Sequence, residues 1–423
     1  MNVLADETAT LFAAMARSAR AAAGVLARAP DATRCAALAA AAAHIRAAVP
    51  EILAANDADV ARARAEGMGG AFLDRLALSP ARIAAMADGV AQVAALPDPL
   101  ARALGAWTRP NGLKIRRIPQ PLGVIGMIFE SRPNVAADAG AICVRAANAV
   151  ILRGGSESLA SARAIGAAMQ AGLAEAGLPE AAVQVAPTAD RGFVGAMLGA
   201  AGLLDLIIPR GGKGLVQRVQ AEARVPVLAH AEGLCHTYVH AAADPAMAEA
   251  VLLDAKLRRP GICGATETLL IDAAVAPALL VRLVAALRAR GCDFRACPRA
   301  RAILPALAPA TEDDFRTEWL DKVLSIRVVD GLDDALAHIR THGSEHTEAI
   351  ITQDARAAGK FLAGIDSAVG MWNASTQFCD GGEFGFGAEI GIATGRLHAR
   401  GPVGPDQLTT FRYHVIGTGQ VRG

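Results

Sequence analysis

The sequence is poor in aromatic residues and has almost no net charge, and each shortage excludes a class of protein. Aromatic side chains make up 4% of the 423 residues although hydrophobic residues reach 53%, so alanine carries much of the apolar content. Because alanine favours helices, an all-β fold is not expected. The formal net charge is +1, from 42 basic and 41 acidic residues. Without a long run of one sign, the chain lacks the basic surface that nucleic acid or an anionic membrane requires.

Long apolar runs are also absent, because charge or proline interrupts each apolar stretch well before the roughly 18 residues of a membrane span. The first thirty residues do not show the basic flank, apolar core and cleavage site of an export signal. Seven cysteines, an odd number, argue against a disulfide framework and for reduced thiols. We therefore expect a soluble, cytoplasmic protein.

The pattern of the chain predicts an α/β fold of two or three domains. Helical periodicity dominates the first hundred residues, and an Asn111-Gly112 pair within 107–118 predicts a projecting hairpin. Beyond Gly123, helical stretches alternate with short β-branched runs, which predict strands at 123–129, 149–152, 183–186, 203–208 and 225–228. Such alternation is typical of a parallel sheet covered on both faces.

A second α/β unit is expected between about residues 233 and 359. A helix over 245–257, a loop with Cys263, a strand over 267–271 and a helix over 277–290 follow one another. The glycine-dense stretch 379–395 suits a backbone that lies close to a ligand. The last residues, 409–416, read as a strand that must pair with another segment.

Cys263 is the strongest candidate for chemistry among the cysteines. Lys256, Arg258 and Arg259 precede it, and Pro260-Gly261 predicts a turn that could present the thiol. Positive charge and aligned backbone N–H groups lower the pKa of a thiol and so favour the nucleophilic thiolate. The alternative is a small buried apolar cysteine, which spacing alone favours.

Two turns could bind the phosphates of a dinucleotide. The first, Arg153-Gly154-Gly155-Ser156, joins a strand to a helix, where free N–H groups and a hydroxyl meet phosphate oxygens. Arg153 stands where NAD enzymes place an acid, so it favours the 2′-phosphate of NADP. The alternative is an ordinary serine-capped helix. The second turn contains Pro209, Arg210, Gly211 and Gly212, but neither turn carries the full G-x-G-x-x-G pattern.

Three histidines, His338, His342 and His346, are spaced four apart, which on one helix would align them for a metal. Gly343-Ser344 interrupts that helix, so a helix end followed by a turn is the better interpretation. We expect no metal site there or elsewhere in the chain.

Several segments together resemble the gamma-glutamyl phosphate reductases, a branch of the aldehyde dehydrogenase superfamily. The resemblance covers nearly the whole chain and is carried by Pro121–Asn134, Ile151–Gly155, Ile208–Gly212, Arg259–Cys263, Glu267–Leu270, Val329–Ile350 and Leu397–Pro402. It implies an NADPH-dependent reduction of L-glutamyl 5-phosphate to L-glutamate 5-semialdehyde and phosphate, the second step of proline biosynthesis. A homo-oligomer is implied, and a transient complex with glutamate 5-kinase is left open.

The resemblance also implies roles for individual residues. Cys263 is the nucleophile that forms a thioester, and its own N–H and the Asn134 side chain are the candidate oxyanion donors. Glu383 and Phe384 match positions that contact the nicotinamide end of the cofactor. The substrate carboxylate or phosphate is assigned to Arg132, His398 and Arg400, with structural ion pairs as the alternative.

Two departures from the superfamily pattern are informative. Members that hydrolyse their thioester use a glutamate in a Glu-Leu-Gly-Gly stretch. The corresponding residues of this chain, 229–236, do not keep that pattern, although His230 or Glu232 could occupy the space near the missing glutamate. A thioester that must meet hydride gains nothing from an activated water, so the loss agrees with a phosphorylating enzyme. The residue after the nucleophile, often asparagine in this family, is Gly264.

The resemblance implies an aldehyde dehydrogenase-like domain organisation: a Rossmann-type cofactor domain, a second α/β domain with the cysteine, and a β-arm for oligomerisation. The expected boundaries are 1–108, 125–232 and 360–398 for the NADP-binding domain, 233–359 for the catalytic domain, and 109–124 and 399–423 for the arm. Two other functions remain open: a non-phosphorylating semialdehyde dehydrogenase and a noncatalytic scaffold of the same fold.

Overall fold

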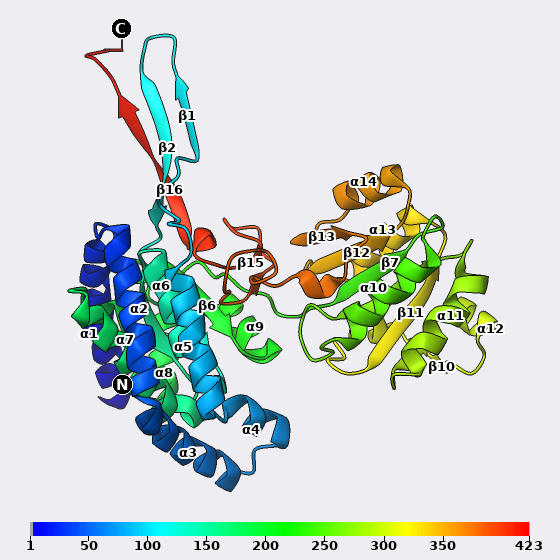
Figure 1. The fold of residues 1–423 in the computed structure, drawn as a ribbon, viewed down its shortest axis with the longest axis horizontal. Helices are drawn as coiled ribbons and strands as arrows, with labels where there is room; N and C mark the ends of the chain where they lie inside the picture. The colour runs from blue at the N-terminus through cyan, green and yellow to red at the C-terminus, as the bar shows by residue number, and fades with distance from the viewer. Residues whose placement is uncertain (1–2, 423) are drawn as a thin grey trace. The chain divides into compact units, whose positions relative to one another are not determined.

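The computed structural model describes residues 3–422 (Figure 1). The expected domain segments 1–108 and 399–423 include residues 1, 2 and 423, which lie outside the described residues. The chain divides into two compact units. The first unit comprises the chain up to Ala229, Gly385–Gly391 and the residues from Val403 onward. The second comprises His230–Phe384 and Ile392–Pro402.

The first unit is rich in helices, as the alanine content predicts. Its helices are α1 (Val3–Leu26), α2 (Asp31–Ala47), α3 (Val49–Ala65), α4 (Gly70–Leu76), α5 (Pro80–Ala94), α6 (Val135–Arg145), α7 (Leu159–Glu175), α8 (Arg191–Leu198) and α9 (Lys213–Glu222). In the described part of the chain, no single helix is long and apolar enough to cross a membrane. Only α2 and α3 together, which are bent by 66°, pass that test of length and composition.

A parallel sheet of four strands forms the centre of the first unit. In the order β5-β4-β3-β6, it contains β3 (Val124–Phe129), β4 (Ala149–Arg153), β5 (Val183–Val185) and β6 (Leu206–Arg210). All residues of β3 and β4 are buried, which explains their continuous apolar runs. Four of the predicted strands are thereby confirmed.

The fifth predicted strand of this unit, 225–228, is wrong. In the described residues this segment forms only an isolated parallel bridge between Ile207 and Val227. Pro226 accepts a hydrogen bond from the Ile207 N–H at 2.9 Å but has no N–H to continue a ladder. A proline inside a β-prone run therefore leaves an edge contact in place of a strand.

The arm is a three-stranded antiparallel sheet. The strands β1 (Gly105–Thr108) and β2 (Lys114–Pro121) form the predicted hairpin, and β16 (Thr409–Ile416) pairs with β2 along its whole length (Figure 1). Gly112 has φ +86°, the conformation that an Asn-Gly turn requires. The hairpin and the terminal strand are confirmed, and contacts assign both to the first unit.

The second unit is built on a parallel sheet of seven strands in the order β10-β9-β11-β8-β7-β12-β13. These are β7 (Cys235–Val239), β8 (Thr266–Asp272), β9 (Asp293–Ala296), β10 (Ala308–Pro309), β11 (Val323–Val329), β12 (Thr347–Ile351) and β13 (Val369–Trp372). One buried cluster packs α10 (Pro245–Leu257), α11 (Ala276–Arg288) and α12 (Pro298–Ile303) on the strands. Another packs α13 (Leu332–His342) and α14 (Ala355–Gly364). A short pair, β14 (Ile392–Ala393) and β15 (Gly401–Pro402), also belongs to this unit.

The structure corrects the expected boundary at residue 360. Of the expected NADP-binding segment 360–398, residues 360–384 and 392–398 belong to the unit with Cys263, and Gly385–Gly391 belong to the first unit. The reason is that β13 pairs in parallel with β12 and so completes one edge of the second sheet. Residues 399–402 also lie in the second unit, so the expected arm segment 399–423 begins too early.

Candidate active site

Cys263 lies in the loop between α10 and β8, where its side chain is partly exposed. Two other segments approach the same edge of the sheet: His346 directly precedes β12, and His230 lies five residues before β7. Because β8, β7 and β12 are neighbouring parallel strands, their amino ends meet at one edge. The topology therefore gathers one thiol and two imidazoles that are far apart in the sequence.

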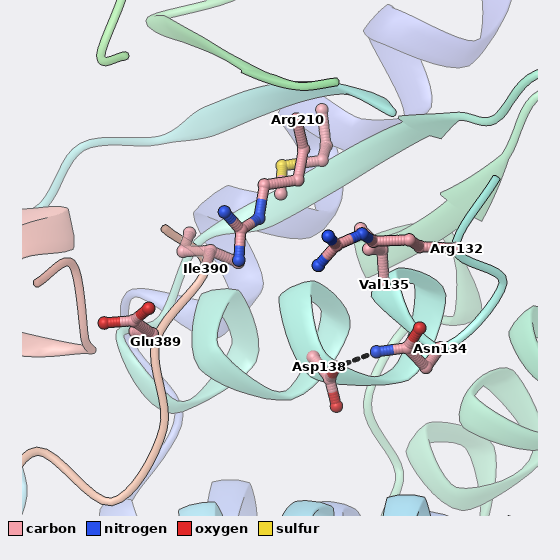
Figure 2. A pocket seen from close by; sticks show the side chains of 8 residues that line it. Arg132, Asn134, Val135, Asp138, Arg210, Glu389 and Ile390 are labelled. Atoms are coloured by element: carbon pink, nitrogen blue, oxygen red, sulfur yellow. Dashed lines mark hydrogen bonds between the residues drawn. The ribbon is translucent and has the colours of Figure 1, made fainter. Parts of the chain in front are cut away.

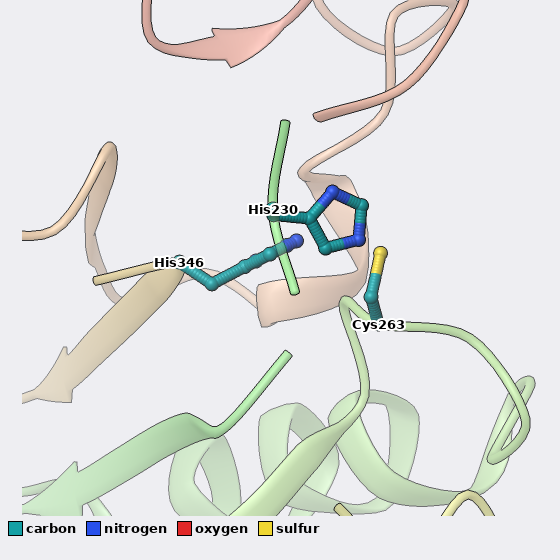
Figure 3. Close-up of side chains that lie close together, drawn as sticks. All are labelled: His230, Cys263 and His346. Carbon is teal, nitrogen blue, oxygen red and sulfur yellow. The ribbon is translucent and has the colours of Figure 1, made fainter. Parts of the chain in front are cut away.

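These three side chains point toward one another (Figure 3). One ligand atom from each, the Cys263 Sγ and one ring nitrogen of each histidine, lies within 4.8 Å of the other two. The two rings stand edge to face with centroids 5.2 Å apart. The histidines near Cys263 were suggested only weakly by the sequence, where His230 was an alternative in a degenerate motif and His346 belonged to a different pattern.

A hydrogen bond to a carbonyl fixes the tautomer of His230, whereas His346 contacts a hydroxyl. The Nδ1 of His230 lies 2.7 Å from the carbonyl oxygen of Ile392, which can only accept, so Nδ1 carries a proton. In the neutral ring the lone pair is then on Nε2. The Nδ1 of His346 contacts the Thr347 hydroxyl at 2.9 Å, and its buried Nε2 has no hydrogen-bond partner. Burial lowers the pKa of His346 to about 3, so this ring is neutral at physiological pH.

Gly233 is packed against the backbone of Cys263. A Cβ at this position would lie 2.6 Å from both Cα and Cβ of Cys263, closer than real contacts allow, and would also strike its carbonyl oxygen. The Gly233 N–H donates to Glu318 Oε1 at 2.9 Å, and the Cys235 thiol donates to the Cys263 carbonyl at 3.1 Å. This close approach requires glycine and holds the His230 segment beside the thiol.

Buried hydrogen bonds hold both ends of the Cys263 loop in place. The hydroxyl of Thr266 lies 2.6 Å from that of Thr237 and 3.0 Å from that of Thr376. Gln377 donates from Nε2 to the carbonyls of Ala255 and Arg259, both at 3.2 Å. Both ends of the loop are thus tied to the segment 376–377, which the structure places in the second unit.

The expected influence of Lys256 on Cys263 is corrected by the structure. Lys256 is fully buried and donates from Nζ to Glu267 Oε2 at 2.5 Å. Burial raises the pKa of Glu267 and the Lys256 ammonium opposes that shift. The charge of Lys256 is therefore neutralised by Glu267, which leaves Arg258 and Arg259 of the three preceding cations.

The helix break predicted after His342 is confirmed, since α13 ends there and Gly343 follows. The rings of His338 and His342 stack with centroids 4.2 Å apart, and His342 Nε2 lies 3.1 Å from Glu312 Oε2. Burial lowers the pKa of His338 to about 2. His346 is separated from this pair by the turn and belongs to the Cys263 cluster.

In the first unit, β4 ends at Arg153 and leads through a short 3-10 turn, Ser156–Ser158, into α7. The Ser158 hydroxyl is fully buried and has no hydrogen-bond partner. Backbone N–H groups, a serine hydroxyl and a guanidinium are donors that suit phosphate oxygens, so the turn fits the phosphates of a dinucleotide. The Arg153 guanidinium is not open as the sequence predicts, because it donates to the carbonyls of Gly154 at 2.9 Å and Ala189 at 2.5 Å.

The end of β6 forms part of a pocket in the first unit (Figure 2). Arg210 from β6 and Arg132 from the turn after β3 converge with Asn134, Asp138 and Glu389. Asn134 donates from Nδ2 to Asp138 Oδ2 at 2.7 Å, and burial raises the pKa of Asp138 to about 6. Two residues that the sequence assigned to different ligands, Arg132 and Arg210, thus line one pocket.

In the second expected phosphate turn, after β6, a neighbouring side chain already occupies the space beside the backbone. Gly212 follows Gly211 after β6 and donates from its N–H to Glu130 Oε2 at 3.0 Å. A Cβ on Gly211 would strike the same Glu130 carboxylate. Pro209 is buried within β6. An acidic side chain thus already accepts from the Gly212 N–H of the second expected phosphate turn.

The other predicted site residues lie in the second unit. Arg400 donates to Thr394 O at 3.0 Å, to Glu345 Oε2 at 3.0 Å and to Asp366 O at 2.7 Å, which supports the structural alternative for this residue. His398 is exposed and has φ +44°, a strained value for histidine. Glu383 and Phe384 are exposed in the turns after β13.

The two-sheet fold with a cysteine loop corresponds to a known family. The model of the aldehyde dehydrogenase family matches residues 2–293, more than half of the chain. The chain therefore belongs to the aldehyde dehydrogenase family. The fold agrees with solved structures of distant members, such as an acetylating aldehyde dehydrogenase from Geobacillus thermoglucosidasius (TM-score 0.68, 17% identity, covering 99% of each chain).

Its nearer relatives carry one name. Gamma-glutamyl phosphate reductase of Gluconobacter oxydans is 67% identical over 418 residues, which is 99% of this chain and 98% of that protein. The same-named protein of Acidiphilium cryptum is 65% identical over the full length of both. The crystal structure of gamma-glutamyl phosphate reductase from Thermotoga maritima has a TM-score of 0.95 and 42% identity, covering 97% of this chain and 100% of that one. The resemblance stated from the sequence is confirmed.

Proposed function

We propose that this chain catalyses the NADPH-dependent reduction of L-glutamyl 5-phosphate to L-glutamate 5-semialdehyde and phosphate, the second step of proline biosynthesis. The observation that carries this proposal is 67% identity to a gamma-glutamyl phosphate reductase across 99% of the chain. The chemistry of the second unit supports it, because Cys263 lies beside imidazole nitrogens where a thiol can lose its proton.

His230 is the proton acceptor for the thiol. With Nδ1 bound to the Ile392 carbonyl, the neutral ring accepts a proton only at Nε2, which becomes N–H as the Cys263 thiol becomes thiolate. The Ile392 carbonyl then stabilises the imidazolium through the Nδ1–H bond, as the third group of a catalytic triad does. His346 is too deeply buried to carry the charge, so the proton stays on His230.

The thiolate attacks the acyl carbon of the substrate, and the bond from that carbon to the phosphate oxygen breaks. Phosphate leaves with the bonding pair, and a thioester remains on Cys263. A bound reduced nicotinamide would supply the hydride that this thioester accepts. The resulting thiohemiacetal oxyanion is stabilised by the Cys263 N–H and the Asn134 amide. It collapses by breaking the C–S bond, which releases the aldehyde and restores the thiolate.

The turn from β4 to α7 would hold the cofactor. Arg153, Gly154, Gly155 and Ser156 lie there, and the unpartnered Ser158 hydroxyl is a donor for a phosphate oxygen. NADP is preferred to NAD if Arg153 exchanges its carbonyl partners for the 2′-phosphate. The turn with Pro209, Arg210, Gly211 and Gly212 would help to hold the same ligand once Glu130 releases the Gly212 N–H. Glu383 and Phe384 would contact the nicotinamide end.

Arg132 is proposed for the anion-binding end of the substrate site, beside the Arg210 guanidinium that is proposed for the cofactor. Their guanidiniums line one pocket, where a phosphate or carboxylate would be paired with two cations. His398 and Arg400 are proposed for the opposite end of the substrate. Arg400 must then either release Glu345 or donate to Glu345 and to the substrate together.

The arm assembles the chain into a homo-oligomer. β16 is an edge strand whose Phe411, Tyr413, Val415 and Ile416 are between 44% and 58% exposed. An exposed apolar edge strand favours pairing with another chain, so a second copy is its natural partner. We place the assembly in the cytoplasm, in keeping with seven free thiols, and leave a transient complex with glutamate 5-kinase as an extension of the proposal.

The test is phosphate dependence in the reverse direction. Oxidation of glutamate 5-semialdehyde with NADP⁺ is expected to require inorganic phosphate, because only phosphate releases the acyl group from Cys263. Sustained turnover without phosphate would instead indicate a non-phosphorylating dehydrogenase. If neither direction is catalysed while cofactor still binds, the chain is a noncatalytic scaffold and the proposal is wrong.

A further inference from the structure

The His230, Cys263 and His346 cluster has the composition of a transition-metal site. Its three ligand atoms lie within 4.8 Å of one another. A tetrahedral zinc ion with Zn–S of about 2.3 Å and Zn–N of about 2.0–2.1 Å holds such atoms about 3.5 Å apart. Side-chain rotations that shorten the distances between the three ligand atoms by about 1 Å would therefore bring all three atoms to bonding distance of one ion. Cys263 and His230 are partly exposed, so their side chains are the two able to move.

The surroundings of both imidazoles are those of metal ligands. A histidine that binds a metal through one nitrogen nearly always donates the other N–H to an oxygen nearby, which fixes the tautomer. His230 does so from Nδ1 to the Ile392 carbonyl at 2.7 Å. His346 contacts the Thr347 hydroxyl through Nδ1 at 2.9 Å. The nitrogen left with a lone pair is Nε2 in His230, and it is also Nε2 in His346 when the Nδ1–H of His346 donates to the Thr347 hydroxyl.

An orphaned atom points to a ligand independently of these distances. The Nε2 of His346 is buried without a hydrogen-bond partner, and the residue is 0% exposed. A buried polar atom that lacks a partner is costly, and a bound ion would satisfy it. The ring is directed at the place where the Cys263 sulfur and the His230 ring meet (Figure 3).

We propose that His230, Cys263 and His346 bind a borderline transition-metal ion, Zn²⁺ in the first place, and that the bound ion inhibits the enzyme by occupying the Cys263 sulfur. One thiolate and two imidazoles suit Zn²⁺, whereas Mg²⁺ and Ca²⁺ prefer the oxygen ligands that this set lacks. The fourth position of the tetrahedron is taken by water. The inhibition, but not the binding, rests on the proposed role of Cys263 as nucleophile.

Binding has a defined proton balance. The S–H bond of Cys263 breaks, a sulfur–metal bond forms, and the proton leaves to the buffer, with no change of oxidation state. The ion withdraws negative charge from the bound sulfur and blocks its approach, so the sulfur attacks an acyl phosphate much more slowly. Conversely, a sulfur already acylated by substrate cannot bind the ion, so substrate protects against inhibition.

Binding is tested with Co²⁺ as a spectroscopic probe on the full-length protein. We expect one Co²⁺ per chain, with visible bands of a tetrahedral ion and a near-ultraviolet thiolate-to-cobalt charge-transfer band, and displacement of Co²⁺ by Zn²⁺ but not by Mg²⁺. Cys263→Ala should abolish the charge-transfer band. His230→Gln and His346→Gln should each weaken binding by more than the roughly 10–100-fold that loss of an outer partner costs. His44→Gln, on the exposed face of α2, is the matched control and should bind Co²⁺ normally.

The result that would overturn the site is unchanged Co²⁺ affinity in both histidine variants, or the absence of stoichiometric binding. If His346→Gln does not fold, as circular dichroism would reveal, His230→Gln decides alone because its side chain is partly exposed. Inhibition is tested separately, as the rate at increasing Zn²⁺ divided by the metal-free rate of each variant. Binding without inhibition would refute the regulatory role alone, while inactivity of the metal-free enzyme would refute the proposed function and leave the metal site standing.

Discussion

The side chains that surround the Cys263 sulfur come from segments outside its own sequence neighbourhood. The cations that precede it in sequence include Lys256, which is buried in a pair with Glu267. The groups that reach the sulfur are imidazoles from the segments before β7 and β12. The sequence alone singled out Cys263 among the cysteines. Its two histidine neighbours could not be predicted, because their positions depend on which strands are adjacent in the sheet.

Replacing Cys263 by alanine or serine is expected to lower turnover by more than about a thousandfold, because removal of a nucleophile eliminates the covalent route. NADPH binding, measured by fluorescence titration, should remain. The control is Cys297→Ala, another free and partly buried cysteine, which should keep the wild-type rate. Retained activity in Cys263→Ala would contradict the assignment.

His230→Gln is expected to lower kcat/KM by about 10²–10⁴-fold, the usual contribution of a positioned base. The glutamine cannot accept the thiol proton, so the remaining rate should rise with pH as hydroxide ionises Cys263. A pH–rate profile of the variant against the wild type checks this expectation. A parallel loss at all pH values would indicate a purely structural role for the ring.

Gly233→Ala tests the close approach of two loops. The added methyl would lie 2.6 Å from Cα and Cβ of Cys263, so the loop must shift, at a cost of about 1–3 kcal/mol in unfolding free energy. The displaced thiol should also react more slowly. Gly261→Ala is the control in the same region, since its Cβ would meet Leu320 O at an ordinary 3.7 Å. Equal effects of both substitutions on activity would refute the argument.

Among the secondary-structure elements, the strands of the first unit were predictable, whereas β8 was the one strand of the seven-stranded sheet that was predicted. The alternation of β-branched runs and helical stretches predicted β3, β4, β5, β6 and β8, and the Asn111-Gly112 pair predicted the hairpin. The segment 225–228 failed because Pro226 removes the N–H that a ladder needs. Domain membership of 360–384 was missed because the short strand β13, which pairs with β12, was not recognised in the sequence.

The histidines packed on the second sheet make the second unit sensitive to acid. Burial lowers the pKa of His338 to about 2 and of His346 to about 3, against 6.5 for the free side chain. The unfolded chain therefore binds more protons below pH 6.5, and stability is lost as pH falls, by up to about 1.4 kcal/mol per pH unit for each histidine.

His338→Leu should flatten this dependence, because both ring nitrogens of His338 are buried without partners. Urea unfolding at pH 7 and at about pH 5 measures the difference. We expect the variant to lose less stability than the wild type between the two values. A larger loss in the variant would show that this histidine is not neutral in the folded state.

At the scale of the whole molecule, the proposed homo-oligomer depends on the arm. Phe411 and Tyr413 are 44% and 53% exposed on β16, and Trp107 packs edge to face on Tyr413. The double substitution Phe411→Glu and Tyr413→Glu should place charges on this face and shift the protein to a smaller mass in light scattering. Leu362→Glu, at 40% exposure on α14, should leave the mass unchanged. An unaltered mass in the arm variant would exclude the arm from the interface.

The central claim is that the acyl group passes through the Cys263 sulfur, and one measurement tests it directly. Incubating the protein with glutamate 5-semialdehyde and NADP⁺ in the absence of phosphate should trap the thioester, since the step that removes it is blocked. Peptide mass spectrometry after acid quench is predicted to find a glutamyl adduct on the peptide that contains Cys263, which disappears when phosphate is added before the quench. An adduct on another residue, or none while NADPH is being formed, would contradict the account.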